Sequence, residues 1–364
     1  MSLDAYNGKR VLVTGHTGFK GSWLCEWLLA LGAEVHGFAL EPPTKPSLFK
    51  QLKLARRIKS HTIGDVRDLD SLVRTMRRVR PDFVFHLAAQ PLVRLSYEKP
   101  METFDTNVMG TVHVLEAARR VFGRTQFEHH VSGHKVSIVC ITTDKVYEND
   151  DSGHAFSEGD PLGGSDPYSA SKGACEIAIQ SYRRSFFSVS DSPIRLASAR
   201  AGNVIGGGDW AKDRLVPDAI RAFFGSRHLV IRNRNSTRPW QHVLEPLSGY
   251  LTLGAALGSD HRFETAFNFG PDSKSVKTVG ELMSSMLPLF PDIAIEDLTD
   301  PAAPHEARSL TLDSSKARRL LGWKPRWNFG RAIWETSEWY KGHYGHDRAV
   351  DLCRGQIKSY MESR

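Results

Sequence analysis

Two side chains of the sequence are spaced so that they could transfer protons together. Tyr168 and Lys172 form a Tyr-x-x-x-Lys pair, and residues four apart on a helix lie on the same face. A lysine ammonium beside a phenol stabilises the phenolate, so the pKa of the tyrosine falls toward the working pH and the phenol can act as a base. The spacing also arises often by chance, and a surface tyrosine–lysine pair is the simplest alternative.

A second polar group follows the apolar run Val136–Thr142, which is typical of a buried strand. Thr143, Asp144 and Lys145 stand directly after this run. Doubly wound sheets place their ligands beyond the carboxyl ends of the strands. The three residues are therefore candidate catalytic groups, although a strand end followed by a polar turn would explain the same pattern.

A glycine-rich turn separates the first predicted strand, Arg10–Thr14, from a predicted helix that includes Trp23–Leu31. Its glycines recur at every third residue. The first permits a tight turn, the second lets backbone approach a pyrophosphate, and the third allows close packing of helix on strand. The helix N-terminus would offer N–H groups and its positive dipole end to the phosphates. The turn thus predicts a dinucleotide site at Gly15, Thr17, Gly18, Phe19 and Gly21.

The second predicted strand, Glu34–Leu40, bears on which nicotinamide cofactor is bound. Glu41 follows that strand and is placed for a ribose hydroxyl, although two prolines after it leave its direction open. No arginine directly follows the strand to hold a 2′-phosphate, so we expect NAD rather than NADP. Leu87, Ala88 and Ala89 end another predicted strand with small residues that would let the backbone approach the cofactor.

An alternation of apolar strands and helical patterns must position these groups. The expected strands are Arg10–Thr14, Glu34–Leu40, Asp82–Leu87, Val136–Thr142 and Ile194–Ala199. The pattern predicts an α/β fold with a doubly wound parallel sheet of the Rossmann type. A smaller C-terminal lobe is expected to interleave with it. The expected boundaries are 1–200 with a returning segment at about 238–262 for the NAD-binding domain, and 201–237 with 263–364 for the substrate lobe.

Composition narrows the functional classes further. The 364 residues are 40% hydrophobic and 24% charged, as in ordinary globular proteins. The start does not resemble a signal peptide, and no apolar stretch is long enough for a membrane span. The four cysteines have no paired spacing for zinc or disulfides, so we expect a reduced cytoplasmic protein without metal. The net charge of +7 is spread along the chain, so we expect no nucleic-acid partner.

The glycine turn, the Tyr–Lys pair and the Thr-Thr-Asp strand end together resemble extended short-chain dehydrogenases/reductases that act on sugar nucleotides. In the dTDP-glucose 4,6-dehydratases the last motif is Thr-Asp-Glu, whereas Lys145 is similar to the residue of the CDP-glucose 4,6-dehydratases. The resemblance runs nearly end to end. It is carried by Gly15–Trp23, Ala89–Val93, Asp166–Lys172, Ala199–Trp210, Thr237–Gly249, His305–Ala307 and Leu312–Trp323.

This resemblance implies an NAD-dependent lyase that converts CDP-glucose to CDP-4-keto-6-deoxyglucose. Tyr168 would take the 4-hydroxyl proton, Thr143 would orient that oxygen, and Lys172 would hold the nicotinamide ribose. Asp144 would protonate the leaving 6-hydroxyl. Lys145 would either remove the C5 proton or stabilise the enolate, and the sequence leaves both roles open.

The resemblance also implies ligand contacts. Asp65 and Val66 would lie against the adenine, although a polar turn with a helix N-cap would explain them equally. Asn203 and Arg238 would hold the substrate diphosphate. The full set of expected substrate residues is Gln90, Asn203, Arg214, Arg238 and His305, of which Arg214 and His305 could equally be surface residues.

A sugar nucleotide and a second copy of the chain, forming a homodimer, are the implied partners. The implied pathway is deoxysugar biosynthesis for surface polysaccharide such as lipopolysaccharide O-antigen. A sugar-nucleotide 4-epimerase, a dehydratase for another nucleotide-diphosphohexose and a non-catalytic NAD- or RNA-binding protein are the alternatives. An epimerase needs no leaving-group acid, and a non-catalytic relative would be expected to have lost the tyrosine, lysine or threonine.

Overall fold

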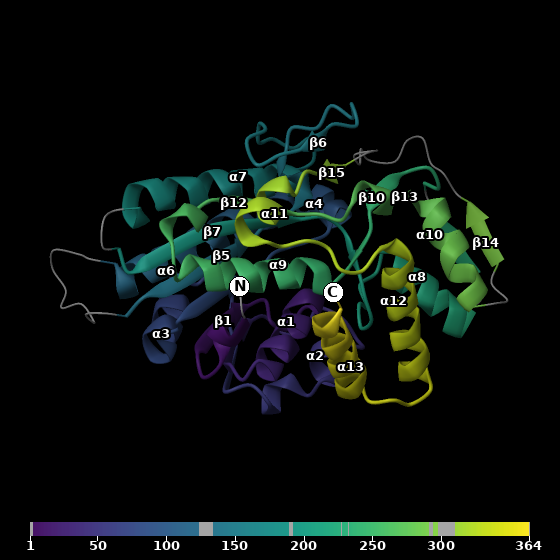
Figure 1. Ribbon diagram of the computed structural model, residues 1–364, viewed down its shortest axis with the longest axis horizontal. Helices are drawn as coiled ribbons and strands as arrows, with labels where there is room; N and C mark the ends of the chain where they lie inside the picture. Colours follow the sequence, from purple (N-terminus) through teal and green to yellow (C-terminus); the bar gives the residue numbers. More distant parts are fainter. Residues whose placement is uncertain are drawn as a thin grey trace.

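The computed structural model describes residues 3–123, 134–188, 192–226, 228–231, 233–290, 294–297 and 310–363. Its centre is a seven-stranded parallel sheet in the order β3-β2-β1-β4-β5-β7-β12 (Figure 1). The strands are β1 (Arg10–Thr14), β2 (Glu34–Ala39), β3 (Ser60–Ile63), β4 (Phe83–His86), β5 (Val136–Ile141), β7 (Ile194–Ala201) and β12 (Ala266–Phe269). The strand order reverses between β1 and β4, as in a doubly wound fold. The predicted Rossmann-type sheet is confirmed.

Helices cover both faces of this sheet because successive strand residues point to opposite sides. In β5, Ile138 and Cys140 belong to one apolar core, whereas Val139 and Ile141 belong to the other. The first core lies under α3 (Leu69–Val79), α6 (Gly110–Phe122) and α7 (Pro167–Tyr182). The second lies under α1 (Phe19–Ala30), α9 (Leu244–Leu257) and α13 (Ala349–Glu362).

Two strands of the sheet were not among those expected from the sequence. The residues of β3 are only partly buried or exposed, so this edge strand lacks the apolar run that marks the central ones. The strand β12 is four residues long and follows a loosely patterned stretch. It lies within 263–364, the range expected for the smaller lobe, and yet pairs with β7 in the main sheet. The division into two lobes stays a prediction.

Several of the elements that follow β7 gather at one end of the molecule (Figure 1). They comprise α8 (Leu215–Arg221), β9 (His228–Ile231), β10 (Thr237–Pro239), β13 (Val276–Thr278), α10 (Val279–Met286), β14 (Ala294–Asp297) and α12 (Phe329–Tyr344). Shorter pieces complete the chain: α2 (Leu48–Gln51), α4 (Val93–Glu98), α5 (Pro100–Phe104), β6 (Ala155–Phe156), β8 (Val204–Ile205), β11 (Gln241–His242), β15 (Thr311–Leu312) and α11 (Ser315–Leu321). Within the described ranges, no helix combines the length and apolar character that crossing a membrane requires.

The helix α13 is fastened to α1 although the two lie far apart in the sequence. Glu26 of α1 is fully buried and accepts hydrogen bonds from Arg57 (Nη1–Oε2 2.6 Å) and from Arg354 of α13 (Nε–Oε1 2.8 Å). The rings of Trp27 and Tyr360 meet edge to face with centroids 5.5 Å apart. Since α1 directly follows the glycine turn, α13 helps to fix the helix whose N-terminus faces the expected phosphates.

Candidate active site

The glycine turn combines two glycines that the fold needs with one that it does not. Gly15 has a φ of +75°, and a Cβ there would lie 2.7 Å from the backbone nitrogen of Ala88. A Cβ on Gly21 would collide with the carbonyl oxygen of Gly15. Gly18, the N-cap of α1, has a φ of −78°, and its Cβ would meet only the Gly15 oxygen, at 3.4 Å. A glycine at position 18 therefore leaves room at the helix N-terminus for an anionic ligand.

The carboxyl end of β2 lies beside this turn. The Thr17 hydroxyl donates to the carbonyl of Leu40 (2.9 Å) and so ties the turn to the strand end. The ring of Phe19 lies beside the loop after β8, where it would be 3.3 Å from a Cβ on Gly206. Glu41 is exposed, and its charge acts on His61 of β3. Glu41 thus stands at the strand end where an adenosine ribose would lie.

The expected adenine pair sits in the loop after β3. Arg67 holds the carboxylate of Asp65 (Nη2–Oδ2 2.6 Å), and this hydrogen bond lowers the pKa of Asp65. Val66 is buried and packs against Gly110 at the start of α6. The N-cap of α3 is Asp68. The Asp65 side chain is therefore held within its own loop, as a polar turn before an N-cap would have it. This does not exclude the adenine contact, which stays a prediction.

The small residues after β4 run alongside the glycine turn. The Leu87 amide donates to the Thr14 carbonyl (3.1 Å) and the Ala88 amide to its hydroxyl (3.3 Å). Ala89 is partly exposed. The side-chain amide nitrogen of Gln90 donates to the Thr103 hydroxyl (Nε2–Oγ1 2.9 Å) and to the Leu92 carbonyl. Its side-chain oxygen accepts from the Leu92 amide. Gln90 therefore shapes its own loop, with its polar atoms already bound to protein.

Tyr168 and Lys172 lie on the first turns of α7, which begins with the N-cap Asp166 and Pro167. Both side chains are buried. Burial raises the pKa of Tyr168, whereas a hydrogen bond with Thr143 and the charge of Arg214 lower it. Burial lowers the pKa of Lys172, whose Nζ donates to the carbonyl of Ile141 (3.3 Å).

The structure therefore assigns the lowering of the phenol pKa to other groups than the sequence suggested. We expected Lys172 to bring the pKa of Tyr168 down. In the structure, burial outweighs the favourable contacts and the pKa of Tyr168 stays above its ordinary value. Thr143 and Arg214 act to lower the pKa of Tyr168, and the ammonium of Lys172 donates to the carbonyl of Ile141.

Thr143, Asp144 and Lys145 form a tight turn directly after β5. The Thr143 hydroxyl donates to Oδ1 of Asp144 (2.9 Å). Nζ of Lys145 lies 3.4 Å from the same oxygen and 3.4 Å from Oδ1 of Asn203. The turn thus brings a hydroxyl, a buried carboxyl and a largely buried amine together beside the Tyr168 phenol.

Lys20 is a member of this cluster that the sequence did not single out. It stands in the glycine turn, partly buried. Burial lowers its pKa to about 8, the nearby charges of Arg214, Lys172 and Lys145 act in the same direction, and the charge of Asp144 opposes them. Lys20 is thus under the influence of three other cationic side chains and one carboxyl group, and this excess of positive charge favours an anionic ligand. The lysine in the Gly15–Trp23 motif was the available signal.

The remaining expected substrate residues are placed as follows. Arg214, the N-cap residue of α8, pairs with Asp209 (3.1 Å) and is close enough to Tyr168 to lower its pKa. Arg238 is buried on β10 and donates to the Thr237 carbonyl (2.8 Å). His305 lies outside the described residues.

Trp210 and Trp240, which could have faced the ligand, belong to the apolar core. The indole of Trp210 donates to Oε1 of Gln51 (3.1 Å). That of Trp240 donates to the Lys277 carbonyl (3.0 Å). Both tryptophans are therefore structural.

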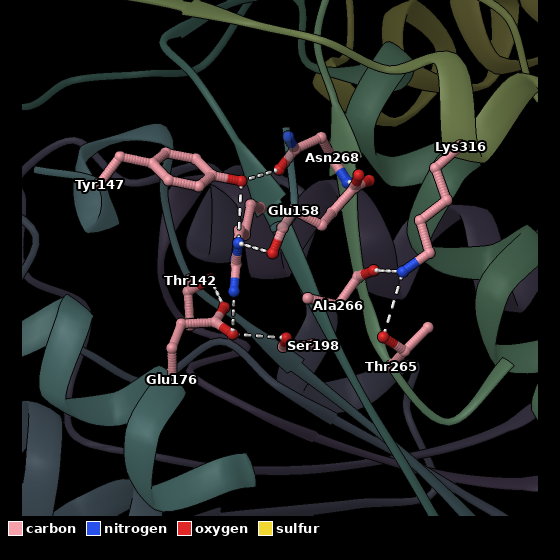
Figure 2. A network of polar contacts seen from close by, with 10 residues as sticks. Thr142, Tyr147, Glu158, Glu176, Ser198, Thr265, Ala266, Asn268 and Lys316 are labelled. Carbon is pink, nitrogen blue, oxygen red and sulfur yellow. Dashed lines mark hydrogen bonds and ion pairs between the residues drawn. The ribbon is translucent and has the colours of Figure 1, made fainter. Parts of the chain in front are cut away.

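A buried polar network lies next to the catalytic turn, because it includes Thr142, the residue before Thr143 (Figure 2). Arg200 of β7 donates to Oε2 of Glu176 on α7 and to the Tyr147 hydroxyl, both at 2.8 Å. Glu176 also accepts from Thr142 (2.5 Å) and Ser198 (2.8 Å). Burial raises the pKa of Glu176, but the charge and hydrogen bond of Arg200 outweigh it, so its pKa lies below the usual value. The network joins the end of β5 to the helix that carries Tyr168 and Lys172.

Comparisons with known proteins show the family to which the chain belongs. Residues 12–336 match the family model described as GDP-mannose 4,6 dehydratase. The chain is 46% identical to the CDP-glucose 4,6-dehydratase of Salmonella typhimurium, over 98% of each chain. It is 27% identical to the UDP-glucose 4-epimerase of Mycolicibacterium smegmatis, over 91% of this chain and 98% of that one.

Among solved structures, the fold is similar to DesIV, the dTDP-glucose 4,6-dehydratase of Streptomyces venezuelae crystallised with NAD and TYD. The TM-score is 0.76 at 24% identity, covering 94% of this chain and 99% of DesIV. This likeness concerns the fold.

Proposed function

The chain belongs to the GDP-mannose 4,6-dehydratase family, and from this premise we propose that it dehydrates CDP-glucose to CDP-4-keto-6-deoxyglucose with NAD. The observation that carries the proposal is the cluster of Thr143, Asp144 and Lys145 beside Tyr168. A dehydration needs an acid for the leaving hydroxyl and a base for the neighbouring carbon. A 4-epimerase, the second candidate because of its 27% identity, needs neither.

The residues of the glycine turn and those at the ends of neighbouring strands could hold NAD. Gly18 leaves space at the N-terminus of α1 for the pyrophosphate, and Glu41 stands at the strand end for the adenosine ribose. Lys172 lies at the opposite end of the site for the nicotinamide ribose. When bound, NAD supplies an acceptor for the hydride from C4 of the sugar and returns that hydride to C6.

Gly18→Ala is expected to weaken NAD binding about tenfold or more with little loss of stability, because its Cβ would occupy the ligand's space rather than the protein's. Isothermal titration with NAD and thermal unfolding measure the two effects. Gly21→Ala is the matched control, since its Cβ would collide with the Gly15 carbonyl and lower the melting temperature. Unchanged NAD affinity in Gly18→Ala would show that the pyrophosphate does not bind at this turn.

With oxidised NAD bound, its positive charge would oppose the effect of burial on Tyr168 and favour the phenolate. In the oxidation step, the Tyr168 phenolate would take the proton of the sugar 4-hydroxyl while the C4 hydride departs with its electron pair. The oxygen becomes the 4-keto group. Thr143 hydrogen-bonds the phenol and so can orient the same oxygen. The resulting ketone makes the C5 proton acidic, which prepares the elimination.

In the elimination step, Lys145 removes the C5 proton and the freed electron pair forms the C5–C6 double bond. The C6–oxygen bond breaks as Asp144 gives its proton to the leaving hydroxyl, and water forms. After the hydride reaches C6, Lys145 returns its proton to C5. Lys145 lies 3.4 Å from Oδ1 of Asp144, so base and acid sit at adjacent carbons of one sugar.

One turnover leaves a proton on Tyr168 and removes one from Asp144. The cycle closes when that proton moves from the phenol to the carboxyl group. Thr143 is hydrogen-bonded to both groups, with its hydroxyl 2.9 Å from Oδ1 of Asp144. We therefore assign to Thr143 the return of the proton as well as the orientation of the substrate oxygen.

Lys145→Ala is expected to slow the exchange of the C5 hydrogen with deuterated solvent by about 10²- to 10⁴-fold, as for the loss of a general base. Mass spectrometry of the sugar nucleotide recovered from deuterated buffer measures the exchange. Lys145→Arg keeps the positive charge without an accessible base. Exchange restored by arginine would mean that Lys145 only stabilises the enolate, and exchange at the parent rate in Lys145→Ala would exclude both roles.

The activity itself is tested by mass spectrometry of products from CDP-, dTDP-, GDP- and UDP-hexoses with NAD present. Loss of one water from CDP-glucose alone is the expected result. An unchanged mass with an inverted stereocentre would identify an epimerase. Loss of water from another nucleotide sugar would keep the reaction and change the substrate.

We further propose a cytoplasmic homodimer that supplies deoxysugar synthesis for surface polysaccharide such as lipopolysaccharide O-antigen. The four cysteines are free and buried, in keeping with a reducing compartment. Large apolar side chains are exposed on α5, α7 and the turn after each, and a second copy would cover them. They are Met101, Phe104, Met109, Ile177 and Phe186. Light scattering of the protein and of Ile177→Glu tests this: a dimer that becomes monomeric is expected, and a monomeric parent would exclude the proposal.

A further inference from the structure

The hydroxyl of Tyr250 is an unexplained polar group in the core. Tyr250 lies in α9 and is fully buried. Among the residues that the structure describes, its hydroxyl has no hydrogen-bond partner. A buried hydroxyl without a partner costs folding free energy, whereas a phenylalanine would bury the same ring without that cost. The chain therefore keeps an oxygen that the fold does not need.

The direction of α9 places Tyr250 below the catalytic turn. Gly258, which caps α9, lies beside Ser137 near the start of β5. Tyr250 comes eight residues before Gly258, which is about 12 Å along the helix. The same distance spans about four residues of a strand. That brings Tyr250 level with Ile141, the last residue of β5. Tyr250 thus approaches the strand end from the sheet face opposite to α7 and Tyr168.

The carboxyl group of Asp144, whose charge acts on Tyr250, is itself incompletely bound. Oδ1 of Asp144 accepts from Thr143 and Lys145, whereas Oδ2 is buried and has no partner among the described residues. Oδ2 points toward Gly202, where a Cβ would lie 2.7 Å away. Burial raises the pKa of Tyr250, and the charges of Tyr168 and Asp144 raise it further. The Tyr250 hydroxyl and Oδ2 of Asp144, both without a partner among the described residues, are therefore close enough for the charge of Asp144 to act on Tyr250.

We propose that Tyr250 is a positioning residue for Asp144, donating a hydrogen bond to Oδ2 as the carboxyl group gives its proton to the leaving hydroxyl. The inference rests on the proposed dehydration. In the substrate complex the hydrogen bond would form directly or through one enclosed water molecule. The hydrogen bond stabilises the carboxylate as its negative charge develops, so it makes Asp144 a stronger acid in the elimination step.

Tyr250→Phe is the test, assayed with CDP-glucose and saturating NAD. We expect kcat to fall about tenfold or more with KM unchanged. The near-ultraviolet absorbance of reduced nicotinamide should accumulate during turnover, because oxidation continues while elimination is slowed. Since Asp144 becomes a weaker acid and keeps its proton longer, the upper limb of the kcat–pH profile should move to higher pH. Stability should be unchanged or increased.

Tyr6→Phe is the matched control. It removes a buried hydroxyl that donates to the carbonyl of Leu251 on the same helix (2.6 Å). It should lower stability and leave kcat and the pH profile unchanged. Parent kcat in Tyr250→Phe, or a loss of kcat without accumulated reduced nicotinamide, would overturn the role of Tyr250. If the parent enzyme forms no dehydrated product, the proposed function itself fails.

Discussion

Replacing Tyr168 by phenylalanine is expected to lower kcat by about 10²- to 10⁴-fold, the usual contribution of a general base. The variant keeps the buried ring but loses the phenol that is hydrogen-bonded to Thr143. Oxidation at C4 then has no proton acceptor, so every later step is blocked. Stopped-flow absorbance should show no reduced nicotinamide in the first turnover, which separates a failure of oxidation from a failure of elimination.

Tyr182→Phe is the control for this variant, because Tyr182 lies on the same helix and its hydroxyl faces Glu116 (3.4 Å) outside the site. It should retain the parent kcat. Titration with CDP-glucose should show that Tyr168→Phe still binds substrate. A first turnover at the parent rate in Tyr168→Phe would show that another group removes the 4-hydroxyl proton.

The second large effect is expected on stability. Arg200→Met should lower the free energy of unfolding by about 3–5 kcal/mol, because it leaves the carboxylate of Glu176 buried without its cation. Both side chains of the pair are only 4% exposed. Urea denaturation measures the loss. Lys277→Met is the control, since it breaks an exposed pair with Glu281 that is worth about 0.5 kcal/mol or less.

The stability loss in Arg200→Met should also depend on pH. In the parent, the pKa of Glu176 is below its ordinary value of 4.5, so the ion pair stabilises the fold above that pH and fades as the pH falls through the folded pKa. In the variant, burial is unopposed and raises the folded pKa, so the penalty grows as the pH rises above 4.5. The difference between the two proteins should therefore shrink from neutral pH toward pH 4.5. A pH-independent difference would mean that lost packing, rather than the unpaired charge, causes the loss.

The elements that the sequence predicted well are those with local signals. The strand β1, the glycine turn and the Tyr168–Lys172 pair each depend on residues within a few positions of one another. The turn Thr143-Asp144-Lys145 was located because it directly follows an apolar strand. The parallel sheet and its two covered faces then followed from the general rules of parallel α/β folds, whereas the order of its strands was seen only in the structure.

The groups that the sequence did not reveal meet only through the tertiary fold. Arg200, Glu176 and Tyr147 come from different elements and look like ordinary surface or core residues in the sequence. Lys20 was visible within a motif, but its proximity to Asp144 depends on where α1 begins relative to β5. The pKa of Tyr168 depends on the balance of burial against the contacts with Thr143 and Arg214, and the spacing of residues in the sequence does not reveal that balance.

The attachment of α13 to α1 has a consequence for how the protein is made. Arg354 and Glu26 are 328 residues apart, so a ribosome adding about 5–20 residues per second needs roughly 15 to 65 seconds between them. During that time the helix after the glycine turn lacks its partner, and the face of Trp27 that meets Tyr360 stays uncovered. The cofactor-binding half is thus made first but completed last. Substitutions in α13 should accordingly reduce the yield of folded protein in the cell more than the activity of the molecules that fold.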